Sequence, residues 1–125
     1  MLKQRIWFML AMALGAAIWF ASPVMTGHRE PWDARSPYYI LALTGTGAMM
    51  GVLQPRPWWL WGVAIYAGQC IAVFALTWLR HSDLGLFVPL GMFMLAIYTG
   101  LSFVGSAVGA WLRRIATRAP TERIK

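Results

Sequence analysis

The sequence contains little charge. Charged residues make up 12% of its 125 positions, there are four acidic residues and one cysteine, and asparagine is absent. Soluble domains average about 25% charged residues, whereas here 59% of residues are hydrophobic. This composition excludes a water-soluble globule, and it equally excludes a disordered chain, which needs low hydrophobicity. The single cysteine excludes a disulfide within the chain.

Four stretches have no Asp, Glu, Lys, Arg or His, namely 6–27, 36–55, 57–79 and 84–112. An apolar helix needs about 20 residues to cross a bilayer. We therefore predict an all-α fold, one domain over 1–125 that forms a bundle of four transmembrane helices. The predicted spans are about 6–25, 38–54, 58–79 and 84–112, with an outer loop at 26–37 and a basic cytoplasmic tail at 113–125.

The first stretch also resembles a secretory signal, because Lys3 and Arg5 precede an apolar run. The run is longer than the roughly 7 to 15 apolar residues of such a signal. Trp19 and Phe20 also occupy the region where a cleavage site needs small residues. We expect this segment to remain as a membrane span.

Basic residues outside the spans predict the topology, because short loops rich in Lys and Arg stay in the cytoplasm. With both ends inside, three basic residues are external: Arg29, Arg35 and Arg80. The eight cytoplasmic ones are Lys3, Arg5, Arg56, Arg113, Arg114, Arg118, Arg123 and Lys125. This positive-inside bias predicts an N-in, C-in multi-pass protein of a plasma membrane, and we expect the bacterial inner membrane.

The aromatic residues predict two interfacial belts, since Trp and Tyr favour the membrane–water boundaries. The expected cytoplasmic belt contains Trp7, Trp58, Trp59, Trp61 and Trp111. The expected outer belt contains Trp19, Trp32, Tyr38, Tyr39 and Trp78. A ligand cage built from the tryptophan cluster at 58–61 is the alternative interpretation.

The formal net charge of +7 does not indicate nucleic-acid binding, which would need a basic face on a folded domain. The charges gather at the expected membrane edge, where each is attracted to anionic lipid by about 1 kcal/mol. We therefore expect the lipid bilayer as a partner, with anionic lipid at the cytoplasmic tail. The last helix can continue into this tail until Pro120 disfavours a helical Ala119.

Small residues predict where helices approach closely, because lipid gives apolar helices no hydrophobic reason to associate. Gly47 and Gly51 form a G-x-x-x-G pattern in the second span, and Gly105 and Gly109 form another in the fourth. Gly68 lies at the centre of a small-residue stripe in the third. Matches by chance are expected in so Gly-rich a chain, so the pattern predicts packing rather than a specific dimer.

No ionisable residue occurs within the four spans. Four-span multidrug exporters carry an essential carboxylate in the first span, and small fluoride channels depend on a membrane asparagine, so both families are excluded. The polar candidates that remain inside the membrane are Thr44, Thr46 and Gln69. The second span could line a solute path, or the threonines could bond to their own helix. Gln69 needs several hydrogen-bond partners, and the backbone of another span could supply them.

Enzymatic motifs are absent from the sequence, which has no C-x-x-C, H-E-x-x-H, phosphate loop or nucleophile elbow. Cys70 lies deep in an apolar span, where a thiol is unreactive. Both histidines fall in outer loops, so haem ligation across the bundle is not available. We expect neither an enzyme nor a cofactor.

The outer loop is the densest polar segment of the chain. Its candidate docking residues are His28, Arg29, Glu30, Trp32, Asp33 and Arg35. By ligand type, His28, Glu30, Asp33 and His81 could hold a metal, but without fixed spacing a salt-bridged loop explains them as well. Aromatic and Arg residues are also the usual anchors of protein interfaces.

These features predict a structural or accessory membrane subunit. It would bind other membrane proteins, or copies of itself, through small-residue helix faces and the outer loop. The alternative is a small oligomeric channel or carrier whose second span lines the path. A metal-dependent membrane enzyme centred on the outer loop is the third interpretation.

Overall fold

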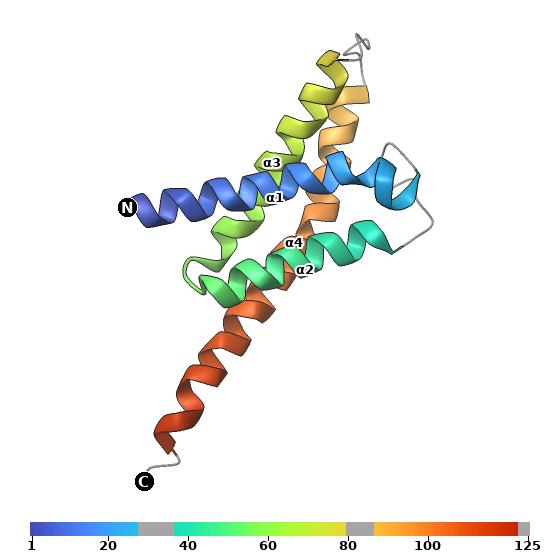
Figure 1. Ribbon diagram of the computed structural model, residues 1–125. Helices are drawn as coiled ribbons and strands as arrows, with labels where there is room; N and C mark the ends of the chain where they lie inside the picture. The colour runs from blue at the N-terminus through green and yellow to red at the C-terminus, as the bar shows by residue number, and fades with distance from the viewer. Residues whose placement is uncertain (28–36, 80–86, 123–125) are drawn as a thin grey trace.

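The structure is a computed structural model that describes residues 1–27, 37–79 and 87–122 of the chain. These residues form four α-helices: α1 (Leu2–Thr26), α2 (Tyr38–Leu53), α3 (Trp58–Leu79) and α4 (Phe87–Glu122) (Figure 1). Three of them, α1, α3 and α4, are long and apolar enough to cross a membrane. The all-helical class is confirmed for the described residues, and the three apolar helices suggest a multi-pass membrane protein.

The helix ends follow the local sequence. Gly27 caps the C-terminal end of α1: its φ of 74° lies in the left-handed region, and its N–H donates to the Pro23 carbonyl at 3.1 Å. Pro37 precedes α2, and Gln54 caps its C-terminal end immediately before Pro55. Proline has no amide hydrogen to donate within a helix, so the prolines after Gln54 prevent α2 from continuing into α3.

Two boundaries differ from the sequence prediction. α1 begins at Leu2 rather than near residue 6, because Lys3, Gln4 and Arg5 are good helix formers that extend the apolar segment. α4 runs to Glu122, so the expected stop at Ala119 is wrong by about one turn, while the predicted start at residue 84 lies outside the described residues. Pro120 removes one backbone hydrogen bond close to the end of the helix, where few such bonds remain to lose.

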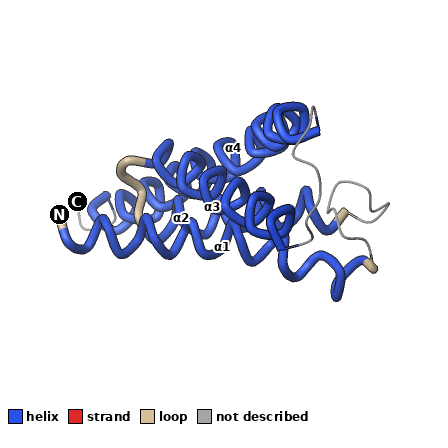
Figure 2. The backbone as a smooth tube through the Cα atoms, turned by 90° about the horizontal axis from the view of Figure 1, so that it is seen from above, coloured by secondary structure: helices blue, strands red, loops and turns tan. Residues whose placement is uncertain are grey.

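The packing joins helices that are not neighbours in sequence. α1 packs mainly on α3 and α2 mainly on α4, while α3 and α4 connect the two pairs. Figure 1 shows α1 and α2 running in opposite directions, with α3 and α4 crossing them obliquely, and Figure 2 shows the same arrangement from above. Side chains from all four helices therefore meet near the middle of the bundle.

The core consists of two buried clusters, and large apolar side chains also cover the outside. One cluster contains Ala11, Ile18, Tyr39, Leu43, Met50, Trp61, Ala64 and Ile65, and the other contains Trp19, Ala72 and Leu95. On the outer surface, Phe93 and Val104 of α4 remain 64% and 60% exposed. A hydrocarbon environment accommodates such exposed apolar surface, whereas water does not.

Candidate functional site

Gln69 is the centre of a buried hydrogen-bond network that includes one side chain from each helix. Its side-chain carbonyl accepts hydrogen bonds from the Trp19 indole of α1, at 3.3 Å, and from the Tyr39 hydroxyl of α2. Its amide donates to the Thr99 hydroxyl of α4 at 3.0 Å. The network thus ties α1, α2 and α4 to α3 through a single glutamine.

The orientation of the Gln69 amide follows from its neighbours. An indole N–H can only donate, so the atom facing Trp19 must be the carbonyl oxygen. With Trp19 and Tyr39 as donors, both lone pairs of that oxygen are used. Thr99 accepts from Gln69 and donates to the Leu95 carbonyl at 2.6 Å, which fixes the direction of the chain of hydrogen bonds.

The network is closed to the surroundings. Gln69 is fully buried, and Thr99, Tyr39 and Trp19 are only 1%, 2% and 4% exposed. The Tyr39 ring also contacts the ring of Tyr98, with centroids 5.0 Å apart. Buried polar groups are strongly destabilising when unpaired, so this mutual satisfaction allows an amide to lie among apolar helices.

Sequence reasoning singled out Gln69 but placed two of its partners elsewhere. Trp19 and Tyr39 were expected in the outer aromatic belt, and the structure buries both against Gln69. Trp61, which was expected in the cytoplasmic belt, is also buried. It is 1% exposed, and its indole N–H donates to the Gln54 carbonyl at 2.6 Å. Trp78, at 77% exposed, has the exposure that a belt position requires.

A signal for Tyr39 was present in the spacing of α2. Tyr39, Leu43, Gly47 and Gly51 follow one another at intervals of four, which places them on one helix face. The glycine pattern had already marked that face as a packing surface. An aromatic residue on it belongs with the core rather than with lipid.

The two threonines proposed with Gln69 do not join its network. The hydrogen bonds of Gln69 run to Trp19, Tyr39 and Thr99. Thr44 and Thr46 are half-buried on α2, and Thr44 meets α4 through its backbone carbonyl, beside Gly105. The structure therefore does not bring the three polar candidates together at one point.

The G-x-x-x-G glycines lie where α2 and α4 touch, and the contact is reciprocal. A Cβ atom on Gly47 or Gly51 would overlap the carbonyl oxygen of Ser102 or Ser106, respectively. On the facing helix, a Cβ on Gly105 or Gly109 would overlap the carbonyl of Thr44 or Ala48, respectively. The Ser102 hydroxyl adds a hydrogen bond to the Leu43 carbonyl at 3.0 Å.

The α1–α3 contact repeats this arrangement. A Cβ on Gly68 would overlap the Met12 carbonyl, and one on Gly15 would overlap the Ile65 carbonyl. Gly15 was not among the glycines expected to pack closely, since the residue four positions after it is Trp19 rather than a small residue. The backbones of both helix pairs approach so closely that only glycine fits at these positions.

The proposed docking residues of the outer loop, His28, Arg29, Glu30, Trp32, Asp33 and Arg35, lie outside the described residues, as does His81. Within 1–27, 37–79 and 87–122 no group of three or more His, Cys, Asp or Glu side chains could hold a metal ion.

Neither the sequence nor the fold matches a known protein family, a curated protein or a solved structure.

Proposed function

We propose that the chain is an integral membrane protein with four spans and both ends in the cytoplasm. In this proposal it is a structural or accessory subunit of the bacterial inner membrane that binds other membrane proteins or a second copy of itself. The observation that carries the proposal is the closed network around Gln69. Its polar groups are used to hold helices together, and they offer no open polar surface to a solute.

The position of α2 supports a fourth span despite its length. Its 16 residues extend about 24 Å, which is less than the roughly 30 Å of a bilayer core. The Tyr38 hydroxyl donates to the Ile18 carbonyl at 2.9 Å, so α2 begins beside the membrane-embedded part of α1. A short span of this kind is accommodated when the bilayer thins locally around it.

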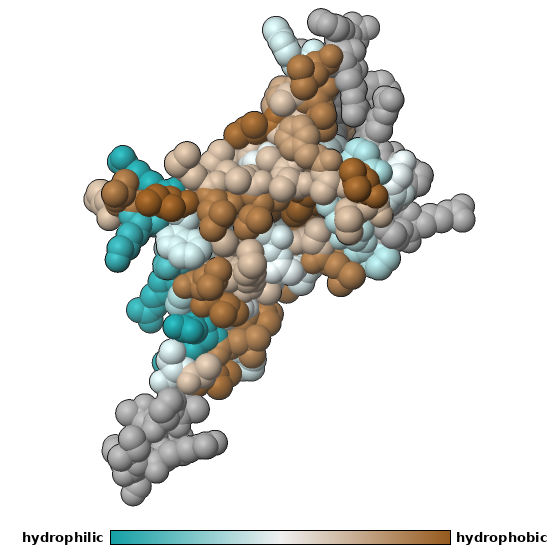
Figure 3. Space-filling view, in the orientation of Figure 1, coloured by the Kyte–Doolittle hydropathy of each residue, from teal (hydrophilic) through white to brown (hydrophobic). Residues whose placement is uncertain are grey.

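The distribution of charge supports the orientation. Lys3, Arg5 and Arg56 lie at the start of α1 and in the α2–α3 connection, and Figure 3 shows the strongly hydrophilic side chains gathered at this end of the molecule. Most of the rest of the visible face is apolar. Basic residues of this kind are retained on the cytoplasmic side during insertion.

The partner surface in this proposal differs from the one expected from sequence. The glycine faces of α2 and α4, and those of α1 and α3, are occupied by each other within the chain. A partner would therefore contact the outer loop 26–37 and the outward faces of the helices. Gly45 and Gly100, whose Cβ positions have open space around them, allow another helix to approach those faces.

The test compares association with transport. The protein is extracted from native membranes in polymer nanodiscs and its complexes are sized, for the wild type, for the double variant Trp32→Ala with Asp33→Ala, and for Gln69→Leu. We expect the loop variant to lose a stoichiometric complex while its helix content is unchanged. Solute flux through liposomes containing the purified protein, abolished by Gln69→Leu and retained by the loop variant, would overturn the accessory role in favour of a channel or carrier.

A further inference from the structure

Two adjoining cavities lie at the end of the bundle where α1 begins and α2 turns into α3. The larger has a volume of about 490 Å³, and its lining includes Arg5, Phe8 and Leu60. The smaller, about 260 Å³, is lined in part by Lys3 and Arg56. Met1 and Gln4 line both, so the two cavities adjoin each other at the start of α1, and together they are called the recess below.

The smaller cavity has basic side chains and, among the described residues that line it, no acidic one. Lys3 and Arg56 come from different segments, the first turn of α1 and the α2–α3 connection, and both line this cavity. The sequence has no Asp or Glu in 1–29 or in 34–82. Among the described residues the one acid is Glu122, in the last turn of α4. An anion in the smaller cavity would therefore be attracted by Lys3 and Arg56. Neither of them is close in sequence to an acidic residue.

The walls of the smaller cavity are held in place by a hydrogen bond. The Trp61 indole is buried and donates to the Gln54 carbonyl at 2.6 Å, which fixes the end of α2 against the start of α3. Trp61 thus offers its ring to the cavity, and its N–H is already used. Donors for a bound anion are the Lys3 ammonium, the Arg56 guanidinium and the Gln4 amide.

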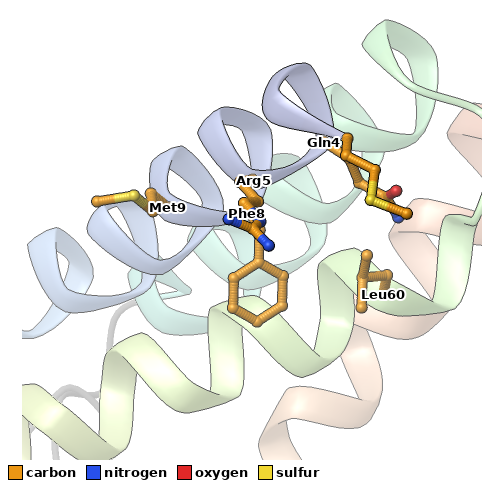
Figure 4. A pocket seen from close by; sticks show the side chains of 6 residues that line it. Gln4, Arg5, Phe8, Met9 and Leu60 are labelled. Carbon is orange, nitrogen blue, oxygen red and sulfur yellow. The ribbon is translucent and has the colours of Figure 1, made fainter.

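The lining of the larger cavity is mostly apolar. Figure 4 shows Phe8 of α1 and Leu60 of α3 on opposite sides of it, with the Arg5 guanidinium nearby. Arg5 precedes Phe8 by three residues, which corresponds to a rise of about 4.5 Å along α1. A ligand that extended from the smaller cavity into the larger would pass from a basic lining to a mostly apolar one.

We propose that this recess binds an anionic phospholipid. The headgroup phosphate lies between Lys3 and Arg56, with Arg5 at the edge, and one acyl chain occupies the larger cavity along Phe8 and Leu60. Basic pockets between membrane helices on the cytoplasmic side are suited to such headgroups. The proposal rests on the membrane insertion proposed above, and it concerns a site separate from the basic tail of α4.

The test measures lipid binding to the purified full-length chain in detergent by native mass spectrometry. The probes are dioleoyl phosphatidylglycerol and dioleoyl phosphatidylcholine, which share acyl chains and differ in net charge. We expect the anionic lipid to bind at least tenfold more tightly. The pocket variant Lys3→Gln with Arg56→Gln should reduce its affinity on the order of tenfold, since each basic residue near the surface contributes measurably.

The matched control removes two charges from another part of the molecule. Arg113→Gln with Arg114→Gln removes two charges from exposed positions of α4 that line neither cavity, where attraction to anionic lipid is diffuse, and we expect it to lower the affinity clearly less than the pocket variant does. Equal losses in the two double variants would mean diffuse attraction, and would overturn the site. Equal binding of the two lipids by the wild type would overturn it as well.

Two further binding measurements identify which part of the lipid is recognised. Leu60→Trp, which fills the larger cavity, should weaken binding of the dioleoyl lipid and spare its dihexanoyl counterpart. Inorganic phosphate at millimolar concentration should fail to displace the lipid, and displacement would instead indicate a free-phosphate site.

Alkaline extraction of membranes separates failure of this site from failure of the proposed function. If the protein stays in the membrane but shows no lipid selectivity, only the lipid site is lost. If it is released from the membrane, the membrane-spanning proposal fails instead.

Discussion

The indole nitrogen of Trp19 lies 3.3 Å from the side-chain oxygen of Gln69, and the two residues are 50 positions apart in the sequence. Neither group could remain unpaired among apolar helices without a large loss of stability. Each therefore constrains where the other's helix can lie. Together with Tyr39 and Thr99 they fix the relative rotation of all four helices.

Replacing Gln69 by Leu should destabilise the bundle by about 1–3 kcal/mol, because it removes the buried acceptor to which Trp19 and Tyr39 donate and the amide that donates to Thr99. Thermal unfolding in detergent measures the loss. Ile71→Leu, at a position 54% exposed on the same helix, serves as the control and should change little. An unaltered melting temperature for Gln69→Leu would mean that the network contributes nothing to stability.

Tyr39→Phe removes one hydroxyl and keeps the ring that contacts Tyr98. We expect a loss of about 0.5–1.5 kcal/mol. In combination with Gln69→Leu the two losses should be clearly non-additive, because both remove the same hydrogen bond. Tyr38→Phe, whose hydroxyl bonds to the Ile18 carbonyl instead, should be additive with Gln69→Leu. Full additivity for Tyr39→Phe would show that the two side chains act independently.

Gly105→Ala should separate α4 from α2, since its Cβ would overlap the Thr44 carbonyl. We expect a loss of about 1–3 kcal/mol, as overpacking typically produces. Gly100→Ala is the matched control on the same helix, because its Cβ meets open space and alanine favours helix formation. If both variants unfold at the same temperature, the α2–α4 contact is not as close as described.

The orientation can be tested with reporters placed outside the helices. Fusions after Lys125 and within 54–57 should be cytoplasmic, and tags within 27–36 should be external, because eight basic residues fall on one side and three on the other. An external reporter after Lys125 would reverse the orientation. Reporters on the same side at 27–36 and 54–57 would show that α2 does not cross.

The sequence predicts the helices well because their signal is local. The absence of charge over 57–79 and the prolines at 55 and 57 are sufficient to place α3 from Trp58 to Leu79. The burial of Trp19 could not be predicted in this way, since an aromatic residue near the end of a span fits both a lipid interface and a helix contact. Choosing between these two environments for Trp19 requires knowing which surface of another helix it would contact. That surface depends on which helices pair.

The choice of partners depends on contacts between distant segments. The G-x-x-x-G pattern identifies Gly47 and Gly105 as sites of close approach without indicating that they face each other. The lipid recess is similarly invisible in the sequence. Lys3 and Arg56 become neighbours only when α1 packs on α3 beside the α2–α3 connection.

The alternation of partners, α1 with α3 and α2 with α4, has a consequence for biogenesis. Helices leave the ribosome in order, so when α1 and α2 have been synthesised neither has its main contact surface available. The close contact of Gly15 with Ile65 requires α3, and that of Gly47 with Ser102 requires α4. In the four-span proposal, insertion of α1 and α2 therefore precedes their assembly, and a nascent chain stopped before α3 would hold two helices with few contacts between them.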